Sequence, residues 1–435
     1  MKKLLLVNPW IYDFKAFDFW MKPLGLLYVG SMLRSSGYEV KLIDCLDRYH
    51  PVLLKAVGDM PKVDKFGRGK FYAEELEKPE LLKTIKRRFK RYGMPKPVLK
   101  EILETIEPPD AILVTSIMTY WYLGVSDTIK TLKEHFPDVP VILGGIYATL
   151  CPEHAKAHSG ADIVMPGFAE KNLFSFFTEF KPIDFEQLPL PAFDLYSKLD
   201  YACVLTARGC PFKCTYCAVP KLCNGFTFRN PNAVLDEIEY YQNLGIPNIA
   251  FYDDALLANP NFTEVLDGII QRKLKLSFHT PNGLHPRFID PEMAYKMFEA
   301  GITTLYLSLE TIEPEIQKAT GGKVTNNDYV RAVEYLKAAG FQNDQIHTYL
   351  LIGMKSNTYN NVKASIDFVR SLDSIVHLAE YSPIPGTAEY TNSGLSEDVD
   401  PLLHNNTLFP VLSGKKRNEM EKVKNYLNRL RTGTY

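Results

Sequence analysis

The sequence of 435 residues has no apolar run long enough to cross a bilayer. Its start, MKKLLLVNPW, has an apolar core only from Leu4 to Val7, which is too short for a signal peptide, and no small-residue cleavage site follows. Neither sign of charge is in excess, because 50 Lys and Arg stand against 51 Asp and Glu. We therefore expect a cytoplasmic protein without strong electrostatic attraction to nucleic acid or to an anionic membrane.

Cysteine is also scarce, and it is unevenly placed. Of 7 cysteines in the chain, three lie in the stretch RGCPFKCTYCAVP, with the spacing Cys210-x3-Cys214-x2-Cys217. An odd number of cysteines, clustered in sequence, argues against a disulfide framework and for a metal site or a reactive thiol.

The first half of the sequence alternates short apolar runs with helical patterns. Buried strands are expected at 3–8, 39–43, 111–116, 140–143 and 162–165, and helices at 24–35, 125–135 and 153–157. The alternation predicts a doubly wound, Rossmann-like parallel sheet. Ligands of such sheets bind at the carboxyl ends of the strands.

An insertion at 47–109 interrupts this alternation. It contains six basic residues between Lys83 and Arg91, which we interpret as a solvated helix face, with a contact to nucleic acid or an anionic substrate as the less favoured alternative. The Pro-rich stretch KPIDFEQLPLPAFDLY is interpreted as a linker. The predicted domains are 1–180 and 198–395, joined by the linker at 181–197 and followed by a helical tail at 396–435.

The second half has six candidate strands with amphipathic helices between them. The strands are expected at 201–206, 248–252, 274–280, 303–309, 345–351 and 376–381, and the helices at 232–244, 261–272, 291–300, 327–339 and 359–372. Gly245, Gly301 and Gly340 stand where helices should end. The pattern predicts a partial (β/α)6 barrel, whose functional groups belong at the carboxyl ends of the strands. The cysteine stretch directly follows the first of these strands.

The three cysteines allow three chemical interpretations. A structural zinc site needs four ligands, and Cys203 and Cys223 are the only cysteines near enough in sequence to add one. A redox pair of Cys214 and Cys217 would leave Cys210 unexplained. A 4Fe–4S cluster normally takes four cysteines, so three would leave one iron open to a substrate or cofactor.

The spacing, together with Tyr216 before the last cysteine, resembles the radical S-adenosylmethionine (radical SAM) superfamily. The resemblance implies a 4Fe–4S cluster on the three cysteines, with S-adenosylmethionine bound at the open iron and cleaved to a 5′-deoxyadenosyl radical. Further matches follow later strands, and they imply contacts to S-adenosylmethionine from Tyr216, Asp253, Asp254, Ser308, Glu310, Ile352 and Gly353. Asp253 and Asp254 depart from the usual Gly-Gly-Glu form of their motif. His285 and Arg287 are weaker candidates at the same rim.

The first half resembles the cobalamin-binding domain that precedes many radical SAM barrels, through KPLGLLYVGSMLRSSGYEV, VILGGIYATLCPE and GADIVMPGFAE. The resemblance implies cobalamin contacts from Ser116, Thr119, Tyr120, Gly144, Gly145, Thr149 and Gly167. The Asp-x-His-x-x-Gly motif, which supplies a histidine to cobalt in some of these domains, has no match here, since the loop after the first strand reads NPWIYDFKAF. SIMTYWY, at 116–122, is expected near the lower face of the cofactor.

Together these resemblances imply a cobalamin-dependent radical SAM enzyme, most simply a methyltransferase acting on an unactivated carbon. The alternatives are a cyclisation or rearrangement on the same two domains, and a non-catalytic metal-binding scaffold. A methylthiotransferase is less favoured, because its front domain should hold three further cysteines and only Cys45 and Cys151 lie there. The substrate is expected to be a peptide, a lipid or a small metabolite, and the reductant a flavodoxin or ferredoxin. An exposed cluster implies an anaerobic setting.

Overall fold

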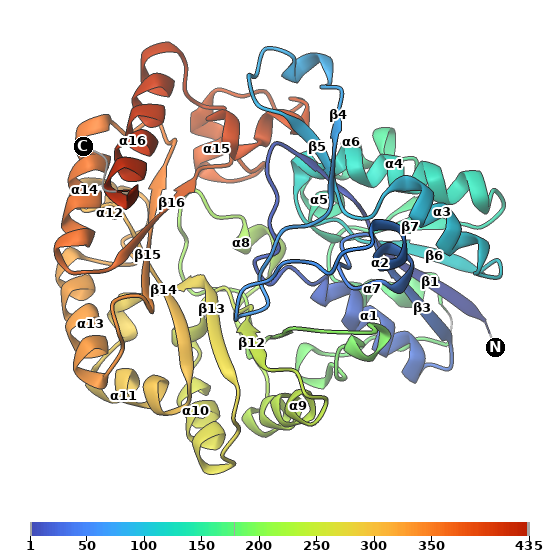
Figure 1. The fold of residues 1–435 in the computed structure, drawn as a ribbon, viewed down its shortest axis with the longest axis horizontal. Coiled ribbons are helices and arrows are strands. Elements are labelled where there is room, and N and C mark those ends of the chain that lie inside the picture. The colour runs from blue at the N-terminus through green and yellow to red at the C-terminus, as the bar shows by residue number, and fades with distance from the viewer. Residues whose placement is uncertain (1, 178, 433–435) are drawn as a thin grey trace. The chain divides into compact units, whose positions relative to one another are not determined.

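The computed structural model of the protein describes residues 2–177 and 179–432. The chain divides into two compact units (Figure 1). Unit 1 is Met1–Ala202 with Asp400–Leu402, and unit 2 is Cys203–Val399 with Leu403–Tyr435. The predicted linker at 181–197 belongs to unit 1, where it holds two short 3-10 helices, Phe185–Gln187 and Phe193–Leu195. The finer domain boundaries stay a prediction.

Unit 1 is built on a five-stranded parallel sheet in the order β3-β1-β6-β7-β8. Its strands are β1 (Lys3–Asn8), β3 (Glu39–Asp44), β6 (Ala111–Val114), β7 (Val141–Leu143) and β8 (Ile163–Val164). Its helices outside the insertion are α1 (Leu24–Ser35), α4 (Tyr122–His135), α5 (Gly145–Leu150), α6 (Pro152–His158) and α7 (Ala169–Asn172). The LLLV segment at 4–7 is at most 2 % exposed, so both faces of β1 are covered, which explains its continuous apolar sequence. The predicted doubly wound sheet is confirmed.

The insertion carries a small antiparallel sheet in the order β2-β5-β4. Its elements are β2 (Ile11–Asp13), which precedes the insertion in sequence, α2 (Pro51–Val57), β4 (Ala73–Leu76), β5 (Phe89–Tyr92) and α3 (Lys96–Glu104). Between Lys83 and Arg91 the predicted helix is wrong, although Lys83, Lys86 and Arg88 are exposed as expected. The end of that run is β5, where buried Arg91 pairs with Glu74 and lies 5.0 Å from the Trp10 ring. A strand depends on partners distant in sequence, so the local charge pattern did not reveal it.

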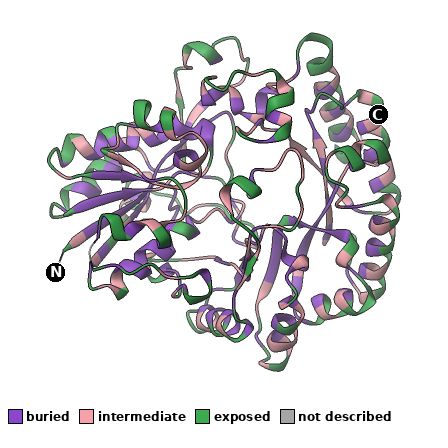
Figure 2. Ribbon diagram, turned by 180° about the vertical axis from the view of Figure 1, so that it is seen from behind, coloured by how far each residue is buried: buried purple, intermediate pink, exposed green. Residues whose placement is uncertain are grey.

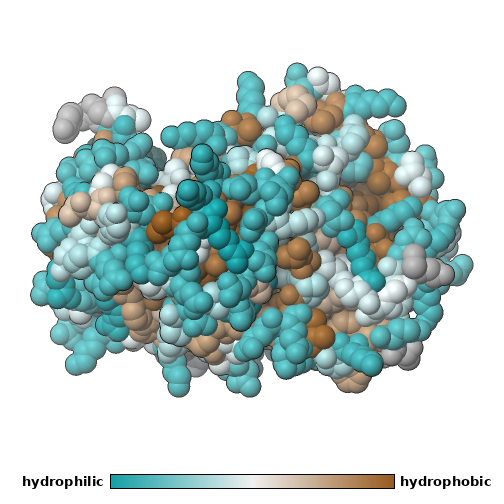
Figure 3. All heavy atoms as spheres, turned by 90° about the horizontal axis from the view of Figure 1, so that it is seen from below, coloured by the Kyte–Doolittle hydropathy of each residue, from teal (hydrophilic) through white to brown (hydrophobic). Residues whose placement is uncertain are grey.

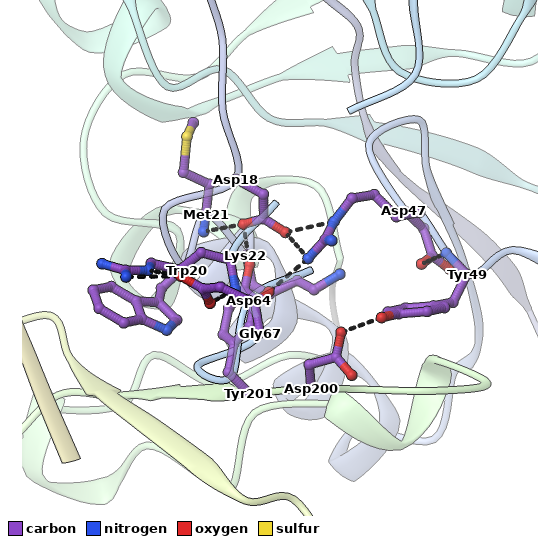
Figure 4. Close-up of polar contacts among 12 residues, drawn as sticks. Asp18, Trp20, Met21, Lys22, Asp47, Tyr49, Asp64, Gly67, Asp200 and Tyr201 are labelled. Carbon is purple, nitrogen blue, oxygen red and sulfur yellow. Dashed lines mark hydrogen bonds and ion pairs between the residues drawn. The ribbon is translucent and has the colours of Figure 1, made fainter. Parts of the chain in front are cut away.

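A buried ion pair ties the insertion to the segment after β2. Arg48 Nη2 lies 2.8 Å from Asp18 Oδ2 and donates to the Gly67 carbonyl oxygen at 2.7 Å. The Tyr201 hydroxyl donates to the other oxygen of Asp18 at 2.5 Å. Figure 4 shows Asp18, Gly67 and Tyr201 gathered at this point. Breaking such a pair leaves a buried charge uncompensated at a cost of about 3–5 kcal/mol, so the pair fixes the path of the insertion.

Unit 2 is built on a six-stranded sheet in which spatial order follows chain order, β9-β12-β13-β14-β15-β16, with parallel pairing from β12 to β16. Its strands are β9 (Ala202–Val204), β12 (Asn248–Phe251), β13 (Ser277–Leu284), β14 (Ile302–Glu310), β15 (Ile346–Ile352) and β16 (Ile375–Glu380). The intervening helices are α9 (Pro231–Asn243), α10 (Phe262–Gln271), α11 (Pro291–Glu299), α12 (Pro314–Ala319), α13 (Asn326–Ala339) and α14 (Tyr359–Ser371). The predicted partial (β/α)6 barrel is confirmed.

The predicted helix ends are confirmed as well. Gly245, Gly301 and Gly340 all have positive φ, as residues that follow a helix commonly do. Between β9 and α9 the chain forms a two-stranded ribbon, β10 (Ala207–Arg208) with β11 (Thr227–Phe228), and the short helix α8 (Val219–Leu222). In each unit the strands are mostly buried, whereas the helices carry exposed outer faces (Figure 2).

The predicted tail helix is present as α16 (Gly414–Thr432), and it packs against the last strand and α14. Lys424 Nζ lies 2.9 Å from Glu380 Oε1 on β16. Arg431 donates to the Val376 carbonyl oxygen of the same strand at 2.6 Å. The helix therefore covers part of an edge strand whose backbone groups would otherwise remain unpaired.

Hydrophilic side chains cover most of the face seen in Figure 3, and hydrophobic ones are scattered over it. Within the described residues, no helix has both the length and the apolar character that a membrane span requires.

A second buried ion pair joins helix α9 to the end of the first strand of unit 2. Arg229 Nη1 lies 2.6 Å from Glu237 Oε2, and their side chains are 2 % and 0 % exposed. The same nitrogen donates to the Leu205 carbonyl oxygen at 3.0 Å, and the Tyr241 hydroxyl donates to Glu237 at 2.9 Å. The pair thereby fixes the backbone just before the cysteine loop.

We expect Glu237→Gln to lower the free energy of unfolding by about 3 kcal/mol, because it leaves the Arg229 charge buried without its counter-ion. Glu239→Gln is the matched control on the same helix, since Glu239 pairs with Arg272 at 3.1 Å but is 48 % exposed, and such pairs contribute less than about 1 kcal/mol. Urea unfolding followed by circular dichroism would measure both. Equal effects of the two substitutions would contradict the importance given to the buried pair.

Candidate functional site

The cysteine loop follows β9 and begins at a buried carboxylate. Asp253, just after β12, is 2 % exposed. Its Oδ1 accepts hydrogen bonds from the Thr206 hydroxyl at 2.5 Å and from the Ala207 backbone N–H at 2.6 Å, and the Thr206 backbone N–H donates to it at 3.1 Å. Burial raises the pKa of Asp253 to about 7, against the opposing effect of these hydrogen bonds. Asp253 therefore holds the backbone where the strand becomes the loop.

The neighbouring carboxylate, Asp254, lies further along the loop. Its Oδ2 accepts a hydrogen bond from the Gly209 backbone N–H at 3.1 Å. Burial raises the pKa of Asp254, while the Gly209 N–H and the Arg208 charge oppose the shift. The charge of Asp254 in turn raises the pKa of both Cys210 and Cys217. The two adjacent aspartates thus have different positions, one under the start of the loop and one beside the cysteines.

The middle of the loop is held from two sides. The Thr215 backbone N–H donates to the Thr320 carbonyl oxygen at 3.2 Å, and the Glu389 N–H donates to the Thr215 carbonyl oxygen at 3.0 Å. Gly321 packs so closely that a Cβ there would lie 3.1 Å from Cys214 Cα, and its φ of +125° suits glycine. Glu389 lies in helix α15 (Ala388–Ser393), after the last strand. Segments distant in sequence therefore determine the shape of the loop.

The three cysteines are unbridged and partly buried. The backbone N–H of Phe212 donates to Cys210 Sγ at 3.5 Å, and that of Val219 donates to Cys217 Sγ at 3.4 Å. Burial raises the pKa of Cys210, and it raises the pKa of Cys217 to about 11. Thiols in such surroundings become thiolates when a metal binds them, and N–H donors to sulfur are a known feature of iron–sulfur sites.

A single-ion site finds no support around this loop. Within 2–177 and 179–432, no three His, Cys, Asp or Glu side chains converge so that they could hold one metal ion. A structural zinc site needs four ligands around one point. In a 4Fe–4S cluster each cysteine binds a different iron, so the thiols need not converge, and the loop fits a cluster better than it fits zinc.

A buried ion pair lies next to the cysteines. Lys323 Nζ is 2.7 Å from Glu310 Oε1, and the two side chains are 12 % and 14 % exposed. The Lys323 ammonium also lies 5.7 Å from the centroid of the Tyr216 ring. Burial lowers the pKa of Lys323, but attraction to Glu310 and Cys214 outweighs it, and the net shift is upward. Glu310 was predicted as a site residue from the sequence, whereas Lys323 was not. In the sequence, the glycine pair of TGGK indicates a tight turn at Lys323.

The two weaker candidates also adjoin the loop. His285, just after β13, is 4 % exposed and stacks on Phe212 with the ring centroids 4.7 Å apart. Its Nδ1 is buried and has no hydrogen-bond partner among the described residues. Burial, together with the charges of Lys323 and Arg287, lowers the pKa of His285 to about 3, so the imidazole is neutral. Arg287 donates to the Gly322 carbonyl oxygen at 3.1 Å.

The remaining predicted residues lie at the carboxyl ends of β14 and β15. Ser308 is 6 % exposed, and its hydroxyl faces Gly283 of β13. Ile352 is fully buried at the end of β15. Gly353 follows with a φ of +96° and lies against the Phe409 ring. These residues share the strand edge from which the cysteine loop arises.

The sequence analysis missed a set of rings on the same sheet. The Tyr306 ring stacks on His347 and on Tyr349, with centroids 4.5 and 5.1 Å away. His347 Nδ1 lies 2.9 Å from His377 Nε2 on the next strand. Thr348, which stands between His347 and Tyr349 on β15, shares a hydrogen bond with the Tyr329 hydroxyl of α13. Because side chains alternate along a strand, the rings of His347 and Tyr349 point to the face of the sheet away from α13. Such stacking depends on strand register, which the sequence does not reveal.

In unit 1, most of the predicted cobalamin residues meet at the carboxyl edge of β6, β7 and β8. The Ser116 hydroxyl donates to the Gly144 carbonyl oxygen at 2.7 Å. The Thr149 hydroxyl donates to the Gly145 carbonyl oxygen at 2.8 Å and accepts from the Gly167 N–H at 3.0 Å. A Cβ on Gly145, whose φ is +89°, would lie 2.4 Å from the Ser116 carbonyl oxygen, so only glycine fits there.

The backbone at Gly144 is packed less tightly than that at Gly145. A Cβ on Gly144 would find no atom closer than 3.8 Å, and Gly167 and Met118 are exposed. A bulky ligand could therefore approach the backbone here. The orphaned His285 Nδ1 in unit 2 and this open glycine edge in unit 1 are compatible with bound S-adenosylmethionine and cobalamin, respectively.

Two further predicted cobalamin residues are buried. Thr119 and Tyr120 are 6 % and 5 % exposed, and Tyr120 packs in an apolar cluster with Ile11, Phe71 and Trp121. The loop after β1 contains no histidine that could bind a cofactor, and part of it forms β2 of the small antiparallel sheet. The prediction that 116–122 packs near the lower face therefore has support at Ser116 and none at Tyr120.

Comparison with known families agrees with this geometry. The model of the radical SAM superfamily matches residues 204–369, and that of the B12 binding domain matches residues 91–173. The first spans the cysteine loop and the strands β12 to β15, and the second spans the open glycine edge.

The chain is similar to several curated proteins over part or most of its length. The chain is 25 % identical over 411 residues to an uncharacterized methyltransferase of Pyrococcus horikoshii, covering 84 % of this chain and 77 % of that protein. It is 21 % identical over 258 residues to the hopanoid C-2 methylase of Rhodopseudomonas palustris, covering 54 % of this chain and 49 % of that one.

Among solved structures, the fold matches the radical S-adenosylmethionine methyltransferase TsrM from Kitasatospora setae with tryptophan substrate and a SAM analog bound. The TM-score is 0.67 at 18 % identity, covering 90 % of this chain and 76 % of that chain. A second structure of TsrM, with cobalamin and a [4Fe-4S] cluster bound, matches with a TM-score of 0.60 at 17 % identity, covering 89 % and 74 %. At this identity the likeness shows the fold.

The structure thus combines a three-cysteine loop, which follows the first strand of a partial barrel, with a doubly wound sheet earlier in the chain. The second unit thus matches the radical SAM superfamily over residues 204–369, and the first unit matches the B12 binding domain over residues 91–173. The predicted cofactors, a 4Fe–4S cluster, S-adenosylmethionine and cobalamin, are confirmed at the level of these domain families.

We expect Asp253→Ala to speed hydrogen exchange in the segment 203–218 at least tenfold, which corresponds to about 1.4 kcal/mol of local stability. The substitution leaves the buried N–H groups of Thr206 and Ala207 without an acceptor. Asp344→Ala, on an exposed turn, is the control and should leave exchange in this segment unchanged. Unaltered exchange in Asp253→Ala would mean that the loop is anchored elsewhere.

Proposed function

We propose that this protein is a cobalamin-dependent radical SAM methyltransferase that transfers a methyl group to an unactivated carbon. One observation carries the proposal, namely a loop that offers three closely spaced thiols at the carboxyl edge of a partial barrel, in a chain that also matches the B12 binding domain. The names of the Pyrococcus and Rhodopseudomonas relatives support methyl transfer as the reaction class.

We assign Cys210, Cys214 and Cys217 as the cluster ligands. A 4Fe–4S cluster held by these three thiolates would supply one-electron reduction to S-adenosylmethionine bound beside it. The chain itself shapes the loop through Asp253, Thr320 and Glu389, and it shields the cysteines by partial burial. Limited solvent access protects a radical from side reactions.

We assign the S-adenosylmethionine contacts to the strand edge around the loop. The carboxylates of Asp254 and Glu310 can accept hydrogen bonds from the ammonium and ribose hydroxyl groups of the cofactor. Ser308 adds a hydroxyl, and Ile352 with Gly353 is assigned to the adenine. Tyr216 is assigned to the same edge. Asp253 keeps a supporting role, because the loop already uses its carboxylate.

We assign cobalamin to the glycine edge of unit 1, where Ser116, Gly144, Gly145, Thr149 and Gly167 line the open space. Cobalamin supplies the methyl carrier of the proposed reaction. The chain lets the cofactor approach its backbone at the glycines and offers no histidine from the loop after β1. The packing of Tyr120 in the apolar cluster supports the segment that follows Ser116.

The substrate is proposed as a peptide, a lipid or a small metabolite, with a flavodoxin or ferredoxin as electron donor and an anaerobic cytoplasmic setting. Nucleic acid is less favoured, because the formal net charge is −1 and binding to the phosphate backbone depends on an excess of positive charge.

The first prediction of this proposal concerns the cluster. After anaerobic reconstitution, the parent protein should bind about four irons and cleave S-adenosylmethionine to 5′-deoxyadenosine, whereas Cys210→Ala, Cys214→Ala or Cys217→Ala should abolish cleavage. Iron and sulfide analysis with chromatography of the nucleoside measures both. Cys223→Ala is the matched control in the same segment and should keep iron and activity. Full cleavage by any of the three variants would refute the ligand assignment.

The second prediction concerns methyl transfer. The parent protein should retain about one cobalt per chain after incubation with hydroxocobalamin, because the open edge can hold one cofactor. Gly144→Val should reduce cobalt retention at least tenfold without changing iron content, since its side chain would fill the open space. Methyl-labelled S-adenosylmethionine should then label product in a screen of candidate substrates. If the protein binds iron and cleaves S-adenosylmethionine but retains no cobalt, the methyltransferase proposal is contradicted. The result would then favour a cyclisation or rearrangement.

A further inference from the structure

The turn Thr320–Lys323, which follows α12, forms one wall of the cysteine loop. Its Thr320 carbonyl oxygen accepts a hydrogen bond from the Thr215 N–H, and Gly321 packs against Cys214. Arg287 donates to the Gly322 carbonyl oxygen at 3.1 Å and so fixes the turn from its other side. The backbone of the turn is therefore held on two sides. This fixes the position from which the side chain of Lys323 extends.

That last residue, Lys323, places an ammonium group close to the cysteines. Its side chain is 12 % exposed and its Nζ contacts Glu310 at 2.7 Å. Burying an ammonium group is costly unless it is compensated by negative charge. Glu310 compensates it on one side, and the charges of Cys214 and Cys217 also act on it. The Lys323 ammonium therefore interacts with a carboxylate, that of Glu310, and with the charges of two cysteines.

The ammonium group lies beside the cysteine loop. Lys323 follows Gly321 by two residues, and a Cβ on Gly321 would lie 3.1 Å from Cys214 Cα. The Lys323 ammonium is 5.7 Å from the centroid of the Tyr216 ring, which belongs to the same loop. Its positive charge also acts on Cys210. In a weakly solvated setting a charge at this range acts more strongly than it would in water.

We propose that Lys323 is a positioning residue whose fixed positive charge stabilises the reduced, more negative form of the cluster and so raises its reduction potential. Three thiolates make the site strongly anionic, and one-electron reduction adds a further negative charge. Net charge around a cluster is one of the factors that set its potential. This inference rests on the proposed assignment of the cluster to Cys210, Cys214 and Cys217, and it is independent of cobalamin and of methyl transfer.

The experiment is a potentiometric titration of the reconstituted protein, monitored by electron paramagnetic resonance, without S-adenosylmethionine or substrate. At a fixed solution potential, Lys323→Met should lower the ratio of reduced to oxidised cluster about tenfold, which is about 59 mV for a one-electron couple. Lys323→Arg keeps the charge and should stay near the parent value. Lys337→Met is the control, because Lys337 likewise pairs with a carboxylate, that of Asp373, at 2.9 Å. Lys337 lies on helix α13, and it is not among the charges named as acting on Cys210 and Cys217.

Glu310→Gln gives a second, opposite test that does not depend on how well Lys323→Met assembles its cluster. It removes the negative end of the pair and should raise the ratio of reduced to oxidised cluster. An unchanged potential in Lys323→Met at full iron content overturns the proposal, and so does an unchanged potential in Glu310→Gln. A Lys323→Met protein with parental potential but weaker binding of S-adenosylmethionine would assign the lysine to that cofactor instead. Absence of iron from the parent protein would contradict the cluster assignment itself.

Discussion

The candidate site depends on how an irregular loop is held in shape, and the carboxylate of Asp253 is the constraint from which the rest follows. It satisfies the backbone N–H groups at the point where β9 becomes the cysteine loop, in a place closed to water. Buried N–H groups without an acceptor are costly, so this anchor defines where the loop begins. Further contacts from Thr320 and Glu389 then hold its middle. A loop supported in this way can present three thiols without a regular secondary structure of its own.

The two units use a common principle with different means. In unit 2 the strand edge is lined by side chains that carry charge or thiol groups, and these are the groups that bind metal clusters and polar cofactors. In unit 1 the corresponding edge consists of glycine backbone and small hydroxyl side chains, and this lets a bulky ligand come close. Both edges are the carboxyl ends of parallel strands, which is where α/β folds bind ligands.

Much of the fold was predictable from local patterns. The strand at 3–8 and the helix at 24–35 have the predicted bounds, and the six strands of unit 2 lie within a few residues of theirs, because buried parallel strands and amphipathic helices have distinct apolar periods. The basic run ending at Arg91 was predicted incorrectly, since its pairing partners lie far away in sequence. Lys323 and the His347–His377 contact were missed for the same reason.

The sequence by itself determined the order of the two domains, the spacing of Cys210, Cys214 and Cys217, and the glycines that permit a close backbone approach. These features are local, because they depend on residue type and on short-range periodicity. Only the tertiary structure decided that Asp253 supports the loop while Asp254 lies beside the cysteines, and that an ammonium group from a distant turn stands next to them. Which of two adjacent carboxylates is buried depends on the strands packed around it, and no local pattern of residues contains that information.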